Sequence, residues 1–147
     1  MKACFWQALK TFSGKEDFML METLQLTNSP AIVGRESRYM TVRVDADKVL
    51  KSWQKSLFSF EWLTPEGKIR SIDDLPMREH EKRLEVEAAL RTGRALERPV
   101  LGIGIMDNVE IGAARAVFLT LAATGHKIIE VHIPAGNKDD FKTFIKS

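Results

Sequence analysis

An apolar run between Gly112 and Gly125 constrains the fold of this chain more than any other sequence feature. Its residues, AARAVFLTLAAT, are rich in alanine and leucine, which favour helix, and they leave no polar side for solvent. The run therefore predicts a buried helix over 113–124 that ends at Gly125. Such a helix needs other elements packed on its sides, so the chain must form a layered core.

The remaining secondary structure follows from the period of the apolar residues. Stretches with alternating or continuous β-branched residues predict strands over 39–44, 99–105, 109–111 and 127–133. Stretches with apolar residues three and four apart predict helices, the first beginning at Asp45 or Asp47 and ending near Phe60, the others spanning 73–93 and 138–145. This order predicts one α+β (mixed α/β) domain in which helices flank a small mixed sheet.

The helical spacing also predicts which side chains are buried. The expected inner positions are Val49, Leu50, Trp53, Leu57 and Phe60 in the first helix, Met77, Leu84 and Ala88 in the second, and Phe141, Phe144 and Ile145 in the last. The aromatic-rich stretch with Trp53, Phe58, Phe60 and Trp62 is interpreted first as core packing. A base-stacking platform is the alternative interpretation.

Composition excludes several classes of protein. The chain has 147 residues, of which 44% are hydrophobic and 29% charged, as in an ordinary globular domain. A disordered tail, a collagen-like chain and a coiled-coil rod are excluded. A single cysteine, Cys4, excludes a disulfide scaffold and fits a reducing compartment such as the cytoplasm. No apolar stretch is long enough to span a membrane.

The turn signal Asn28-Ser29-Pro30 suggests a boundary near residue 30. We expect an irregular N-terminal arm over 1–30 and the domain itself over 31–147. Met19 and Met21 are alternative start positions.

The net charge of +2 is unevenly distributed. One segment concentrates basic side chains: Arg35, Arg38, Arg43, Lys48, Lys51 and Lys55. This segment is interpreted as a solvated surface or as a basic face that contacts nucleic acid. The histidines His80, His126 and His132 do not have the spacing of a zinc site.

Arg115 is the one charged residue of the buried run, and it falls in the first helical turn. The helix dipole disfavours a cation there, and a buried guanidinium needs a partner. The partner is either Glu110 or Asp107 from the preceding turn, or an external anion held on the free N–H groups of residues 113–115. Gly112 would let such an anion approach the backbone. The residues leave both alternatives open.

The segment from Pro99 to Ala116 (PVLGIGIMDNVEIGAARA) resembles the core of the ParB/sulfiredoxin superfamily. Gly112-Ala113-Ala114-Arg115 is similar to the family's G-x-x-R turn, which leads into an alanine-rich helix. The strand over 128–133 and the opening run Val42–Val49 also fit the family's order of elements, so the resemblance covers residues 40–134. Where sulfiredoxins carry cysteine after the glycine, this chain has Ala113, which argues against thiol repair.

The resemblance implies a nucleotide-phosphate pocket formed by Gly112, Ala113, Ala114 and Arg115, with ATP or CTP as the cofactor. Asp107 and Glu110 would hold Mg²⁺ beside the phosphates, and with Arg115 they would be the catalytic residues. Small members of the family on mobile elements, such as plasmid fertility-inhibition proteins of the Osa type, are linked to ATPase and DNase activity. The implied role is therefore that of a nucleotide-binding, DNA-associated protein that interferes with DNA transfer.

The alternative hypothesis is a non-catalytic interaction module. Such a protein would keep the fold, use Arg115 as a structural pair and inhibit a protein of the DNA-transfer machinery. The pair Ala113-Ala114 favours this hypothesis, and an Arg115 without an internal partner favours the first.

Overall fold

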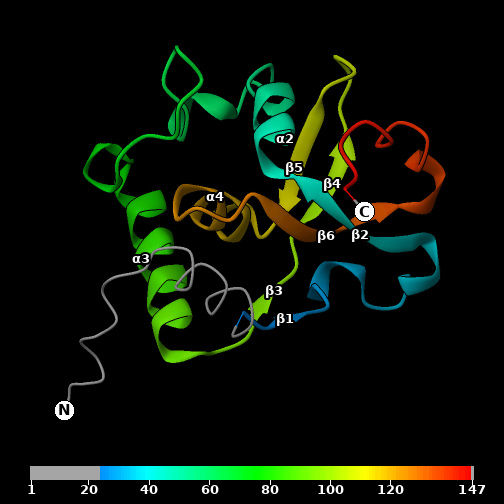
Figure 1. Cartoon of the computed structure of the whole chain (residues 1–147), viewed down its shortest axis with the longest axis horizontal. Helices are drawn as coiled ribbons and strands as arrows, with labels where there is room; N and C mark the ends of the chain where they lie inside the picture. Colours follow the sequence, from blue (N-terminus) through cyan, green and yellow to red (C-terminus); the bar gives the residue numbers. More distant parts are fainter. Residues whose placement is uncertain (1–23, 147) are drawn as a thin grey trace.

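The computed structural model describes residues 24–146 and confirms an α+β fold (Figure 1). Its main sheet has the spatial order β2 (Tyr39–Asp45), β6 (Ile128–Pro134), β4 (Val100–Ile103) and β5 (Val109–Ala113). β2 and β6 are antiparallel along their full length, β6 and β4 are parallel, and β4 and β5 form an antiparallel hairpin. The sheet is therefore mixed, as the sequence predicted.

The helices in residues 24–146 are α2 (Ala46–Trp53), α3 (Met77–Thr92) and α4 (Arg115–Ala123). The predicted buried helix is confirmed as α4, in which every residue from Ala116 to Leu121 is buried. α3 packs against α4. Short 3₁₀ turns occur at η2 (Pro30–Ile32), η3 (Glu36–Arg38), η4 (Ser59–Glu61), η5 (Ile72–Asp74) and η6 (Ala135–Asn137). Among residues 24–146, no helix is both long and apolar enough to cross a membrane.

The first predicted helix is shorter than expected. Asp45 caps it by accepting from the Lys48 amide at 3.1 Å, but α2 ends at Trp53 instead of continuing to Phe60. The Ser59 hydroxyl donates to the carbonyls of Gln54 and Ser56. Such serine–backbone bonds offer the chain an alternative to helix. The expectation that Leu57 and Phe60 are inner residues is wrong, because both are exposed.

α3 begins after Pro76 and ends at Gly93, which adopts the left-handed conformation with φ 73°. The predicted stripe of Met77 and Leu84 is wrong, because both side chains are exposed. Glu79, Val86 and Ala89 are buried instead. The Glu79 carboxylate accepts a hydrogen bond from the Trp62 indole N–H, so the buried side of α3 includes a charged position that an apolar pattern does not reveal.

The C-terminal segment over 138–145 forms turns, not the predicted helix. Phe141 is nevertheless fully buried, and Phe144 and Ile145 pack against the core as predicted. Ile145 forms an antiparallel bridge with Val44 of β2. This pairing covers one edge of the sheet and holds the segment extended at its end.

Residues 24–30 pack onto the domain, and residues 1–23 of the predicted arm, with Cys4, Met19 and Met21, lie outside the described residues. β1 (Leu26–Thr27) pairs in parallel with β3 (Leu96–Glu97). These strands were not predicted, because two residues are too short to show a period. Beyond β1, the amide of Ser29 donates to Nε2 of the buried His132 at 3.3 Å.

His132 is expected to make folding stability pH-dependent. Burial lowers its pKa below the ordinary value, Arg98 lowers it further, and Glu130 acts in the opposite direction. The imidazole takes up a proton more readily in the unfolded chain than in the folded one. The contribution of His132 to the free energy of unfolding is therefore fully present above about pH 6.5 and decreases as the pH drops below that value. Urea unfolding across this range should show the decline, and His132→Gln should flatten it while His80→Gln should not. An equal slope in wild type and His132→Gln would contradict this assignment.

Candidate functional site

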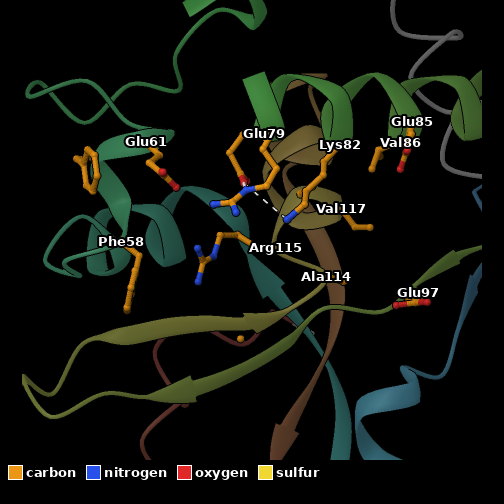
Figure 2. A pocket seen from close by; sticks show the side chains of 14 residues that line it. Phe58, Glu61, Glu79, Lys82, Glu85, Val86, Glu97, Ala114, Arg115 and Val117 are labelled. Atoms are coloured by element: carbon orange, nitrogen blue, oxygen red, sulfur yellow. Dashed lines mark ion pairs between the residues drawn. The ribbon is translucent and has the colours of Figure 1, made fainter. Parts of the chain in front are cut away.

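A cleft with a volume of about 940 Å³ opens where η4 and the first turns of α3 and α4 meet. Its polar and apolar lining comes from these elements and from β3 and β5: Phe58, Phe60, Glu61, Arg78, Glu79, Lys82, Glu85, Val86, Glu97, Gly112, Ala114, Arg115, Ala116 and Val117. Figure 2 shows Glu61 of η4, Glu79 and Lys82 of α3, and Arg115 of α4 directed toward the same space. The cleft therefore combines charges of both signs with exposed aromatic rings.

The turn before α4 shapes one wall of this cleft. Ala114 adopts the left-handed conformation, with φ 55° and ψ 41°, and no side chain caps the helix. The amides of Val117 and Phe118 both donate to the Ala114 carbonyl, at 3.0 and 3.2 Å. The amides that precede them at a helix start have no acceptor within the helix. The start of α4 thus borders the cleft with its positive end.

Gly112, which the sequence analysis selected as the point where an anion could approach the backbone, is not the strained residue of this turn. A Cβ on Gly112 would lie 3.4 Å from the Val100 carbonyl oxygen, an ordinary contact, and its backbone is not left-handed. Gly112, Ala114 and Arg115 line the cleft, whereas Ala113 belongs to β5 and is not among the lining residues.

Ala114→Gly is expected to stabilise the protein by about 0.5–1 kcal/mol. Left-handed backbone costs an L-residue roughly 1–2 kcal/mol, and this gain exceeds the extra entropy of glycine in the unfolded chain. The midpoint of urea unfolding should rise. Ala113→Gly, in the adjacent strand, is the matched control and should lower it. A lower midpoint for Ala114→Gly would show that the left-handed turn is not strained.

Arg115 has aromatic neighbours but no acidic partner in the described part of the chain. Its Nε donates to the Ile111 carbonyl at 3.3 Å, and its guanidinium lies 5.7 Å from the Trp53 ring centroid and 5.4 Å from that of Phe58. Among residues 24–146, no carboxylate lies within 4.0 Å of it. The internal pair that the sequence left open, with Glu110 or Asp107, is not made.

Glu110 and Asp107 do not lie at the cleft. The Ser56 hydroxyl donates to one carboxylate oxygen of Glu110 at 2.7 Å, and the Asn108 amide donates to the other at 3.0 Å. Asp107 is exposed in the β4–β5 turn with φ 61°. Neither residue lines the cleft, so the expected catalytic and magnesium-binding roles beside a phosphate do not fit their positions. Residues 24–146 contain no cluster of three or more side chains suited to a metal ion.

Glu79 organises the opposite wall of the cleft. It is only 6% exposed, accepts from the Trp62 indole at 2.9 Å, and lies 3.7 Å from the Arg78 guanidinium and 3.6 Å from the Lys82 ammonium. It was not among the buried positions that the sequence predicted for this helix. The signal that could have found it is Trp62, since a buried indole N–H needs an acceptor.

The aromatic stretch divides between core and cleft. Trp53 and Trp62 are fully buried, which confirms the packing interpretation for these two residues. Phe58 and Phe60 are 57% and 66% exposed and line the cleft. The packing interpretation is therefore wrong for them.

The basic segment does not contribute to the cleft. Its side chains are all exposed and are distributed over η3, β2, α2 and the turn that follows: Arg35, Arg38, Arg43, Lys48, Lys51 and Lys55. None of them lines the cleft around Arg115. A nucleic-acid contact through these residues would be a separate surface.

No protein-family model, curated protein or solved structure matches this chain. The fold and the cleft alone define the class: an α+β domain with a cleft of mixed charge and exposed aromatic rings at the start of a buried helix.

Proposed function

We propose that the cleft binds the phosphate groups of a nucleotide, with Arg115 as the cation that receives them. The observation that carries this proposal is the position of Arg115 at the uncapped start of α4, facing a cleft, without a carboxylate within 4.0 Å among residues 24–146. A helix start repels a cation and attracts an anion. An anion beside Arg115 would satisfy both the guanidinium and the open amides.

The other charges of the cleft favour one end of it for such an anion. Arg78 and Lys82 lie close to Glu79 and offset its charge. Glu61, Glu85 and Glu97 line the remaining space and disfavour phosphate near them. The proposed position of the anion is therefore beside Arg115, which lies across the cleft from Glu79 and Lys82 in Figure 2.

The nature of the nucleotide follows from the family resemblance. If the chain is a ParB/sulfiredoxin-like protein of the small type found on plasmids, ATP or CTP is the expected ligand and interference with DNA transfer the expected role. Because Asp107 and Glu110 do not line the cleft, we propose binding and assign no hydrolytic or magnesium-dependent step to these residues.

Thermal unfolding with ATP, CTP or inorganic tripolyphosphate tests the proposal. A ligand that binds only the folded state raises its stability in proportion to the logarithm of its concentration above the dissociation constant. A rise with at least one of these ligands is expected. An unchanged unfolding temperature with all of them would contradict phosphate binding.

DNA association is proposed for the separate basic segment. If its exposed cations contact phosphates, the affinity for DNA falls linearly with salt on logarithmic axes, with a slope of about 0.9 per contact. Replacing Lys48, Lys51 and Lys55 of the α2 region by alanine should reduce that slope, measured by fluorescence anisotropy over a salt series. An unchanged slope would exclude this segment as the DNA contact.

A second candidate function is the interaction module. The observation that favours it is the exposure of two large apolar side chains, Leu57 at 86% and Met77 at 78%, which are next in sequence to the cleft residues Phe58 and Arg78. Contiguous exposed apolar surface is typical of protein contacts. Failure of every phosphate ligand in the thermal test would favour this candidate over the first.

A further inference from the structure

We propose that Phe58 and Phe60 form a stacking wall for a nucleobase, which makes the ligand a nucleotide or the end of a nucleic acid strand and not a simple phosphate. The inference rests on the proposed phosphate site but uses different residues and different chemistry. It assigns these phenylalanines the role of determining specificity.

The first argument is the unusual exposure of both rings. Phe58 and Phe60 are more than half exposed although they belong to a stretch whose other aromatic residues, Trp53 and Trp62, are fully buried. Both line the cleft. Leaving large aromatic surfaces in water forfeits the favourable free energy of burying them. A ligand with a flat apolar surface would recover that free energy.

The second argument is that the backbone holding these rings is fixed. The Phe58 amide donates to the Ser56 hydroxyl at 3.1 Å, and Ser59 between the two phenylalanines is buried and bonds two carbonyls. Trp62 attaches the end of the segment to Glu79 of α3. A preorganised platform loses little conformational entropy when a ligand binds.

The third argument is the position of the cation relative to the rings. The Arg115 guanidinium lies 5.4 Å from the centroid of the Phe58 ring. Because the guanidinium lies over one face of this ring, a base would stack on the other face, and a phosphate attached to that base would reach Arg115 past the edge of the ring. Nucleotides carry this combination of flat base and phosphate, and base–aromatic stacking tolerates every base because each has a π-face. The predicted ligand class is thus defined by chemistry and not by one base.

Binding to matched ligands tests the stacking wall. ATP, CTP, a 5′-phosphorylated oligodeoxynucleotide and tripolyphosphate would be titrated against wild type, Phe58→Ala, Phe60→Ala and Phe58→Trp, with Leu57→Ala as the exposed neighbour outside the cleft. Phe58→Ala should weaken the base-containing ligands by roughly 5- to 150-fold, the usual effect of losing one stack. Tripolyphosphate binding should not change, and Phe58→Trp should restore nucleotide binding.

The outcomes separate this inference from the proposed function. Tripolyphosphate that binds wild type as tightly as ATP and CTP would overturn the stacking wall and leave the phosphate site intact. Equal losses for tripolyphosphate and nucleotides in Phe58→Ala would overturn it as well, because the variant would then act through Arg115. Absence of binding by all ligands would overturn the phosphate site itself. Comparison of ATP and CTP with the oligonucleotide decides whether the base belongs to a free nucleotide or to a strand end.

Discussion

Arg115→Ala is expected to abolish the stabilisation of this protein by nucleotides. At a nucleotide concentration about 100 times the dissociation constant, the wild-type protein should gain about 2.7 kcal/mol, which corresponds to roughly 5–10 °C in the unfolding temperature. The variant lacks the one cleft cation that has no acidic neighbour among residues 24–146. Differential scanning fluorimetry with and without ATP and CTP measures the loss.

The controls for this prediction separate charge from packing. Arg115→Lys keeps the positive charge and should retain part of the shift, although a single ammonium does not reproduce the paired donors of guanidinium. Arg91→Ala removes an exposed arginine of α3 that does not line this cleft, and should retain the full shift. If nucleotides raise the unfolding temperature of Arg115→Ala as much as that of the wild type, the proposal that Arg115 binds the phosphates is contradicted.

Trp62→Ala is expected to give the largest loss of stability, about 3–5 kcal/mol. Trp62 is fully buried, and its indole N–H donates to Glu79 at 2.9 Å. The variant would lose this packing and would also leave the buried Glu79 carboxylate without its neutral donor. Urea unfolding with and without the substitution measures the difference in unfolding free energy.

Two further variants test how much of the lost stability comes from the hydrogen bond to Glu79 and whether the loss is specific to the buried position. Trp62→Phe retains most of the ring and removes the hydrogen bond, so its smaller loss reports the unsatisfied carboxylate. Leu57→Ala, at an 86% exposed neighbouring position, should change stability by less than about 0.5 kcal/mol. A Trp62→Ala protein as stable as the wild type would show that the wall of the cleft does not depend on this contact.

The parts of the fold that the sequence predicted are those with a long and regular apolar period. α4, α3 and the strands β2, β4, β5 and β6 lie within a few residues of the predicted ranges. The end of α2 was not predicted, because it depends on hydrogen bonds of Ser56 and Ser59 with the backbone. These bonds compete with helix formation, and the spacing of apolar residues does not reveal them. β1 and β3 arise only from tertiary pairing between distant residues.

The candidate site could be predicted only in part. The sequence identified Gly112, Ala114 and Arg115, all of which line the cleft. It did not identify the opposite wall, because Arg78, Glu79 and Lys82 share a helix face that reads as solvated until Trp62 is placed against it. Asp107 and Glu110, to which the sequence analysis gave catalytic and magnesium-binding roles, do not line the cleft. Asp107 is exposed to solvent in the β4–β5 turn, and the Glu110 carboxylate accepts hydrogen bonds from the side chains of Ser56 and Asn108.

The antiparallel pairing of β2 with β6 has a consequence for how the chain assembles. It joins residues 39–45 to residues 128–134, so the longest strand pair of the sheet closes only when almost the whole described polypeptide has emerged from the ribosome. Contacts of such high sequence separation slow folding, since the loop entropy is lost before the pairing is gained. Until β6 is synthesised, the nascent chain presents β2 as an open edge, and in this interval unpaired strand edges favour aggregation.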